Sequence, residues 1–172
     1  MKKVVLMGFL GLASASLTVA AANEGHMKHH AQAGEQHPAT ATADAPVSQD
    51  VTISSCWIRS LPLPAPSAGY FMVKNSGAQA VKLVGAASES YGMVMLHQTT
   101  HEDGLSKMSM AHAIDIPAGS ELEFKPGGYH AMLEKPHTTI TVGSTVTMDF
   151  LLDNGQKASA QCEVKPANTK AH

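Results

Sequence analysis

A histidine and a methionine two positions apart carry the most specific chemistry in this sequence. His130 and Met132 lie in the segment Lys-Pro-Gly-Gly-Tyr-His-Ala-Met-Leu. In an extended strand, residues i and i+2 project to the same face, which makes the imidazole and the thioether neighbours. A thioether neither titrates nor forms strong hydrogen bonds. Its distinctive chemistry is soft ligation, and beside an imidazole it favours Cu(I) over harder divalent ions.

Two residues upstream extend this pair to a set of four ligands. Ten residues separate His97 from Met108, and twenty-one separate Met108 from His130. The pattern His-x10-Met-x21-His-x-Met predicts a shell of two nitrogen and two sulfur atoms around one copper ion. Taken singly, Met108 is more often a packing residue than a ligand, because Met commonly fills cores. Met110, on the same predicted strand face as Met108, is the alternative sulfur ligand.

The sequence around these ligands resembles a known protein family. It contains Trp-Ile-Arg at 57–59, Ala-Gly-Tyr-Phe at 68–71, Ile-Pro-Ala-Gly at 116–119 and Pro-Gly-Gly-Tyr-His-Ala-Met-Leu at 126–133. With both ligand spacings, residues 57–164 resemble the periplasmic copper chaperones called PCuAC. The resemblance implies a cupredoxin-like fold and a Cu(I) site formed by the four residues above. It also implies delivery of copper to the CuA centre of cytochrome c oxidase, directly or through an assembly factor.

The sequence lacks the residues that other functional classes require. A blue-copper electron carrier requires a cysteine thiolate beside its two histidines, and no Cys is adjacent to the His-x-Met pair. His-Glu-Asp-Gly at 101–104 lacks the second His of a zinc-protease motif, and no Gly-x-Ser-x-Gly elbow is present. We therefore expect a copper carrier and not an enzyme. The alternative is a copper-sequestering or copper-resistance protein without a dedicated acceptor.

The N-terminus predicts export to the periplasm. Two lysines at positions 2 and 3 precede an apolar stretch, and Ala-Ala-Ala at 20–22 fits the cleavage rule, so residues 1–22 are predicted to be a signal peptide. Residues 23–48 are poor in large apolar side chains and are predicted to be a flexible tail. The formal net charge of −2 gives no electrostatic case for nucleic acid, and we expect no stable membrane anchor. Clustered imidazoles suit Cu(II), which predicts a secondary site formed by His26, Met27, His29, His30 and His37.

Short β-prone segments separated by turn signals predict an all-β Greek-key sandwich over residues 49–166, followed by a short tail at 167–172. Asn-Gly at 154–155 predicts a tight hairpin between the last two strands. Met72, Met93, Met95 and Met148 are predicted to pack in the core. The predicted strands cover residues 51–58, 70–73, 80–87, 93–99, 105–112, 121–124, 138–142, 145–152 and 157–164.

Cys56 and Cys162 are the only cysteines. In an exported protein a disulfide is the default pairing, and the two residues lie in the predicted first and last strands. Strand alternation argues the other way, because Val51, Ile53 and Trp57 share a face from which Cys56 points away. A free thiol pair and an accessory copper site are the alternatives. A thiol–disulfide enzyme is disfavoured because no Cys-x-x-Cys motif is present.

Overall fold

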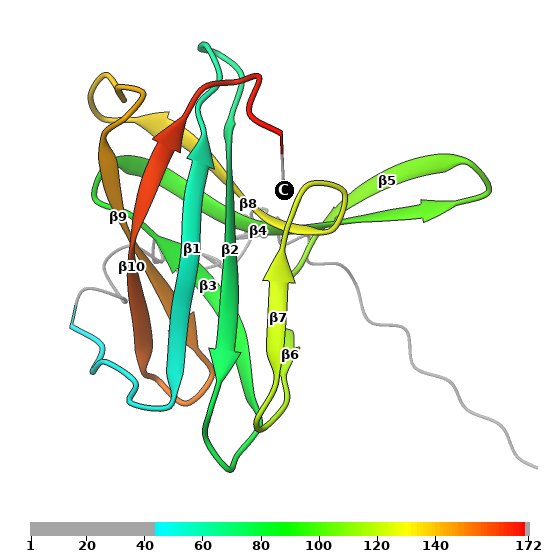
Figure 1. Cartoon of the computed structure of the whole chain (residues 1–172), viewed down its shortest axis with the longest axis vertical. Helices are drawn as coiled ribbons and strands as arrows, with labels where there is room; N and C mark the ends of the chain where they lie inside the picture. Colours follow the sequence, from blue (N-terminus) through cyan, green and yellow to red (C-terminus); the bar gives the residue numbers. More distant parts are fainter. Residues whose placement is uncertain (1–43, 171–172) are drawn as a thin grey trace, which may run out of the picture. The chain divides into compact units, whose positions relative to one another are not determined.

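The computed structural model describes residues 44–170, and within this range every regular element is a β-strand (Figure 1). This part of the chain contains no helix able to cross a lipid bilayer. The predicted signal peptide and residues 23–43 of the predicted tail lie outside the described residues. The strands are β1 (Val51–Arg59), β2 (Ser67–Asn75), β3 (Val81–Ala87), β4 (Tyr91–Glu102), β5 (Leu105–Met110), β6 (Ile114–Ile116), β7 (Glu121–Phe124), β8 (Tyr129–Pro136), β9 (Thr145–Leu152) and β10 (Lys157–Lys165).

One hydrogen-bonded ladder joins these strands in the order β5-β4-β8-β2-β1-β10-β9-β3-β6, and β7 also pairs with β2. Among the described strands, β1 and β10 pair in parallel and the other pairs are antiparallel. The ladder folds over, so that β1, β2 and β10 lie in front of β4 and β8 in Figure 1. Sheet packed on sheet around one core is a sandwich, and the predicted all-β class is confirmed.

Alternating side chains supply the core between the layers. Residues 146, 148, 150 and 152 of β9 are buried, and Thr145 and Thr147, which alternate with them, are exposed, as the sequence predicts. Phe71 of β2 stacks on Phe124 of β7 with ring centroids 4.2 Å apart, and it lies 4.4 Å from Phe150 of β9. Burying a Phe side chain contributes about 1.5–3 kcal/mol. The contact between Phe71 and Phe150 joins β2 to β9, two strands that are not neighbours in the ladder, and stabilises the packing between the layers.

The turn between β9 and β10 has the predicted hairpin chemistry. The N–H of Gly155 donates to the carbonyl of Leu152 at 3.0 Å, and Gly155 has a φ of +79°. The side-chain oxygen of Asn154 accepts a hydrogen bond from the N–H of Gln156 at 3.0 Å. Glycine adopts positive φ without the Cβ clash of other residues, so the hairpin prediction is confirmed.

One predicted strand does not form, and two observed strands were not predicted. No strand forms over residues 138–142, where the N–H of Ser144 instead donates to the carbonyl of Thr141 in a turn. This segment is rich in β-prone residues, but strand formation depends on packing against neighbours more than on propensity. The second error is an omission, because the predicted strands leave out β6 and β8. The strand β8 pairs with both β4 and β2, and it carries His130 and Met132.

Residues on both sides of the predicted domain, 49–166, form hydrogen bonds with the strands. Val47 forms a parallel bridge with Lys157, and Ser48 is buried with its hydroxyl accepting from the N–H of Val51 at 3.2 Å. At the other end, Arg59 donates to the carbonyl of Thr169 at 3.0 Å. Residues 47–48 of the predicted tail are therefore hydrogen-bonded to the sandwich. Backbone hydrogen bonds fix these residues although their composition is poor in apolar side chains.

A β-bulge in β1 decides where Cys56 points. The register with β2 shifts between Ser54 and Trp57, and Ser55 has a φ of +51°. One extra residue in a strand exchanges its inward and outward positions. Cys56 consequently joins the core together with Ile58, and Trp57 is only partly buried. The expectation that Cys56 points away from the apolar face is wrong, because simple alternation does not anticipate the bulge.

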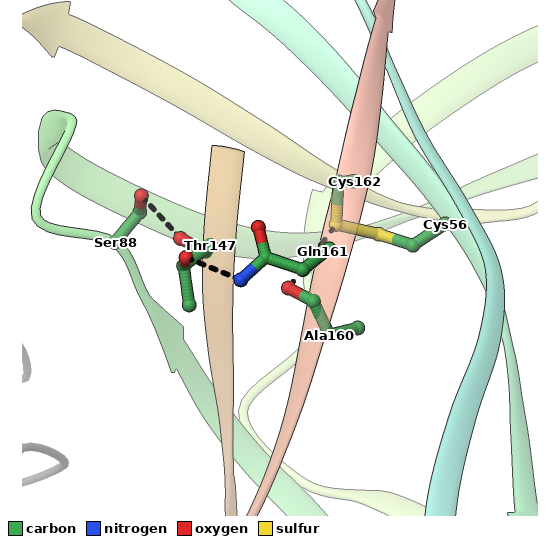
Figure 2. Close-up of a disulfide and its surroundings, with 6 residues drawn as sticks. All are labelled: Cys56, Ser88, Thr147, Ala160, Gln161 and Cys162. Carbon is green, nitrogen blue, oxygen red and sulfur yellow. Dashed lines mark hydrogen bonds between the residues drawn. A yellow bond between two sulfur atoms is a disulfide. The ribbon is translucent and has the colours of Figure 1, made fainter. Parts of the chain in front are cut away.

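The structure joins Cys56 of β1 to Cys162 of β10 in a disulfide, with Cα atoms 4.5 Å apart (Figure 2). The parallel register of the two strands brings these positions side by side, since Trp57 pairs with Glu163. The bond closes a loop with a sequence separation of 106 residues. In the chain-entropy account, a loop of this length stabilises the fold by about 4–5 kcal/mol.

Candidate metal centre

His97 and His130 lie directly opposite each other on β4 and β8. Their ring centroids are 5.9 Å apart, and the ring planes make an angle of 84°. The adjacent residues Leu96 and Ala131 are buried in the core. Side chains alternate along a strand, so both imidazoles are on the opposite, outer face of this strand pair. One ion can bridge rings at this separation, since a metal–nitrogen bond to His is about 2 Å long.

A tight turn before β8 orients His130. The N–H of Gly128 donates to the carbonyl of Lys125 at 3.0 Å, with Pro126 and Gly127 at the centre of the turn. Gly127 has a φ of +81°, and Pro followed by a residue with positive φ is the signature of a type II turn. The Gly128 carbonyl lies 3.0 Å from Nδ1 of His130. A proton on Nδ1 donates to this carbonyl and leaves the Nε2 lone pair free for a metal ion.

His97 contributes a nitrogen with an unmet bonding requirement. Its Nδ1 atom is buried and has no hydrogen-bond partner among the described residues. Leaving a buried polar atom without a hydrogen bond costs about 1–3 kcal/mol of folding free energy. A cation bound to this nitrogen would remove the penalty. Burial lowers the pKa of His97 below its usual value, and His130 lowers it further, while Glu134 opposes both. The neutral, metal-binding form of His97 is therefore favoured.

The strand register places the two predicted sulfur ligands differently. Met132 follows His130 by two residues on β8, so it lies on the same face as the imidazoles. Met108 lies on β5 opposite Thr99, two residue pairs further along β4 than His97. It shares that outer face, but it is 52% exposed. The alternative residue, Met110, lies directly opposite His97 and is equally exposed at 51%.

The β4–β5 hairpin is linked to the turn before β8 through His101. Nε2 of His101 lies 3.2 Å from the carbonyl of Gly127, and Nδ1 lies 2.8 Å from the hydroxyl of Ser106. A proton on Nε2 satisfies both contacts, because it donates to the carbonyl while Nδ1 accepts from the hydroxyl. The contact connects the hairpin that carries Met108 to the turn that orients His130.

Three of the methionines predicted to be core residues are not fully buried. Met148 has no exposed surface, as predicted, but Met72, Met93 and Met95 are each partly exposed. Met95 lies opposite Met132 on the face that carries the two imidazoles. The sequence prediction assigned Met95 to the core and therefore did not include it among the ligands. The sequence does contain a signal for Met95: Met95-Leu96-His97 has the reverse order of His130-Ala131-Met132.

The remaining candidate donors lie elsewhere. The five residues of the predicted tail site fall outside the described residues, so that site stays a prediction. Cys56 and Cys162 are oxidised to a disulfide in this structure and offer no thiolate. Within residues 44–170, no group of three His, Cys, Asp or Glu side chains is arranged to hold a metal ion. On the face that carries the two imidazoles, the register places Met95 and Met132 two residues away and Met110 opposite His97.

Residues 51–164 match the LpqE-like family. The chain belongs to that family. LpqE-like proteins are the PCuAC family, and the resemblance drawn from the sequence is thereby confirmed. The chain is 29% identical over 129 residues to Lxx21020 of Leifsonia xyli subsp. xyli, which is named as a lipoprotein, and covers 77% of it. It is 33% identical over 104 residues to the uncharacterized protein RP573 of Rickettsia prowazekii, of which it covers 56%.

Solved structures of PCuAC proteins have the same fold. The Cu(I) form of DR1885 from Deinococcus radiodurans is 30% identical to this chain, with a TM-score of 0.55 over 76% of this chain and 85% of that one. The apo PCuAC domain of PmoF2 superposes with a TM-score of 0.60 at 21% identity, over 74% of this chain and 98% of that domain. The predicted cupredoxin-like sandwich is thereby confirmed.

Proposed function

We propose that this PCuAC protein is a copper chaperone that binds one Cu(I) ion through His97, Met108, His130 and Met132. The observation that carries the proposal is the opposed pair of imidazoles on β4 and β8, with one nitrogen buried and unpartnered and thioethers beside it. The copper(I)-bound relative at 30% identity supports the choice of ion. Two nitrogen and two sulfur donors suit Cu(I) better than harder cations.

The chemistry of the donors favours a carrier. None of the four ligands is charged when it binds. The nearby negative charge that attracts a cation is the carboxylate of Glu134, two residues after Met132. Thioether ligands are soft and uncharged, and they exchange without a proton being taken up or released. An ion held in this way can pass to another protein by replacement of one ligand at a time.

We further propose that the protein acts in the periplasm after removal of residues 1–22. Its acceptor is the CuA centre of cytochrome c oxidase, reached directly or through an assembly factor, as the family resemblance implies. The rival is sequestration, in which the protein buffers copper and has no dedicated recipient. The two functions differ in whether a specific apo-protein accelerates the loss of copper.

A transfer assay tests this difference. Cu(I)-loaded protein is mixed with the apo CuA domain, and the copper content of each protein is measured after rapid separation. A chaperone transfers copper faster to this acceptor than to a small-molecule chelator of matched affinity. Equal rates for both would support sequestration. A His130→Ala variant, in which one proposed ligand is missing, serves as the control for copper carried at other sites.

X-ray absorption of the Cu(I) form tests the ligand set itself. The expected spectrum contains both nitrogen and sulfur neighbours, and its sulfur contribution falls in Met132→Leu. A spectrum with only nitrogen and oxygen neighbours would contradict the proposed site. Leucine is the preferred replacement because it conserves the volume of methionine and disturbs packing little.

A further inference from the structure

The outer face of β4 and β8 carries a donor set that does not involve β5. Met95 and His97 alternate along β4 with Leu96 between them, and His130 and Met132 alternate along β8 in the opposite direction. The register places His97 opposite His130 and Met95 opposite Met132. Directly opposed side chains on one face of an antiparallel pair have Cβ atoms about 4.5–5.5 Å apart. Two nitrogen and two sulfur donors thus occupy successive positions on one face of the strand pair, with the pair Leu96 and Ala131 between them facing the core.

Burial shows that Met95 is not an ordinary core residue. Its strand neighbours Val94 and Leu96 are 6% and 3% exposed and belong to the core, whereas Met95 and Met132 are both partly exposed on the other face. The thioether of Met95 is therefore accessible from the side on which the imidazoles lie. By contrast, Met108 reaches the same face from the exposed strand β5, where it pairs with Thr99, two residue pairs along β4 from His97.

We infer that Met95 is an additional Cu(I) ligand that alternates with Met108. The inference rests on the proposed function and identifies how the ion stays bound while one ligand is exchanged. As the bond from copper to the Met108 sulfur breaks, a bond to the Met95 sulfur forms, with copper remaining Cu(I) and no proton moving. The position vacated by Met108 is on the exposed side of the site, where a ligand from the acceptor can enter.

The assignment of Met95 can be tested with three variants and one matched control. Met95→Leu, Met108→Leu and the double variant conserve side-chain volume. The control is Met93→Leu, because Met93 lies two residues before Met95 on the same partly exposed face but pairs with Glu134. Cu(I) affinity is measured by competition with a Cu(I) chelator, and Ag(I), a redox-inert soft cation, is the probe for NMR of the methionine methyl groups.

If Met95 is a ligand, Ag(I) shifts its methyl resonance together with that of Met132 and leaves that of Met148 unchanged. Met108→Leu alone should lower Cu(I) affinity by about tenfold, and adding Met95→Leu should lower it by roughly a further tenfold or more, a coupling expected of residues that share one ion. Adding Met93→Leu instead should change the affinity less than about twofold.

Two results would overturn the inference, and they separate it from the proposed function. A Met95 methyl resonance that Ag(I) does not shift, with no added loss in the double variant, would exclude Met95 as a ligand while the four-residue site stands. Failure of the unmodified protein to bind Cu(I) at all would remove the proposed function and this inference together.

Discussion

The two halves of the candidate site differ in how the fold supports them. On the β4–β8 half, the residues between the ligands are core residues, and His130 is only 7% exposed. On the β5 half, every residue from Leu105 to Met110 is exposed, and β5 extends beyond the layered strands in Figure 1. In the first half, β8 pairs with β4 on one side and with β2 on the other, and both β4 and β8 pack against the core. The second half pairs only with β4, so its ligands are held by fewer contacts.

This contrast indicates that the β4–β8 ligands hold the ion and that the β5 ligand is the one displaced when the ion is released. Ligands supported by a packed core keep their geometry and contribute most of the affinity. A ligand on an exposed hairpin is easier to displace, since its motion disrupts little buried surface. The same four donors arranged on four core strands would bind copper but would present no ligand to an incoming acceptor.

The largest effect is expected at His130. Replacing it with Ala removes a nitrogen ligand from the packed half, and Cu(I) affinity should fall by about 100-fold or more, the upper end of what loss of an outer-shell partner costs. Chelator competition measures the change. His137→Ala is the matched control, because the His137 side chain is exposed and its backbone N–H donates to the carbonyl of Ser90. Similar losses in both variants would show that His130 has no special role.

A smaller difference should separate the two sulfur ligands. Met132→Leu should weaken Cu(I) binding more than Met108→Leu, although both remove one thioether, because Met132 is on the packed half. We expect a ratio of about tenfold between the two variants, which corresponds to roughly 1.4 kcal/mol. Isothermal titration in competition with a chelator gives both affinities. Equal losses would contradict the proposed difference between the halves.

The turn that orients His130 can be perturbed without touching a ligand. Gly127→Ala places a Cβ at a φ of +81°, which costs about 1–2 kcal/mol of folding stability. The strain acts on the turn that presents the Gly128 carbonyl to His130, so Cu(I) affinity should also fall by a few-fold. Gly143→Ala is the control, because Gly143 also has positive φ, at +87°, in a turn outside the site. Urea unfolding should show similar stability losses in the two variants, and only Gly127→Ala should lose Cu(I) affinity.

The smallest effect concerns protonation of His97 in the metal-free protein. Burial and His130 lower its pKa, so its NMR titration midpoint should lie below the reference value of about 6.5. Because the unfolded chain then binds the proton more readily, stability is lost as the pH falls below that value. His130→Gln should raise the midpoint, and Glu134→Gln should lower it further. A midpoint at or above the reference value would contradict the burial of His97.

Part of this site was readable from the sequence because its ligands have unusual chemistry. A His-x-Met pair in an extended segment shares a face whatever the neighbouring strands are, and the type II turn before it is encoded by Pro126-Gly127. The turn at Asn154-Gly155 was predictable for the same reason, since its backbone requirement is local. The spacing to His97 and Met108 then supplied the family resemblance.

Non-local contacts decided the rest. The register between β4 and β8, separated by more than twenty residues of chain, brings Met95 opposite Met132, and alternation alone could not identify that partner. The bulge at Ser55 exchanges the inward and outward positions of β1, so that Cys56 points into the core. The parallel pairing of β1 with β10 places Cys162 next to it, and the two form the disulfide. The sequence by itself determined the donor types and the local turns, because these depend on side-chain chemistry and backbone φ. Only the tertiary structure decided which donors share a face and how deeply each is buried, because strand pairing is set by packing across the whole core.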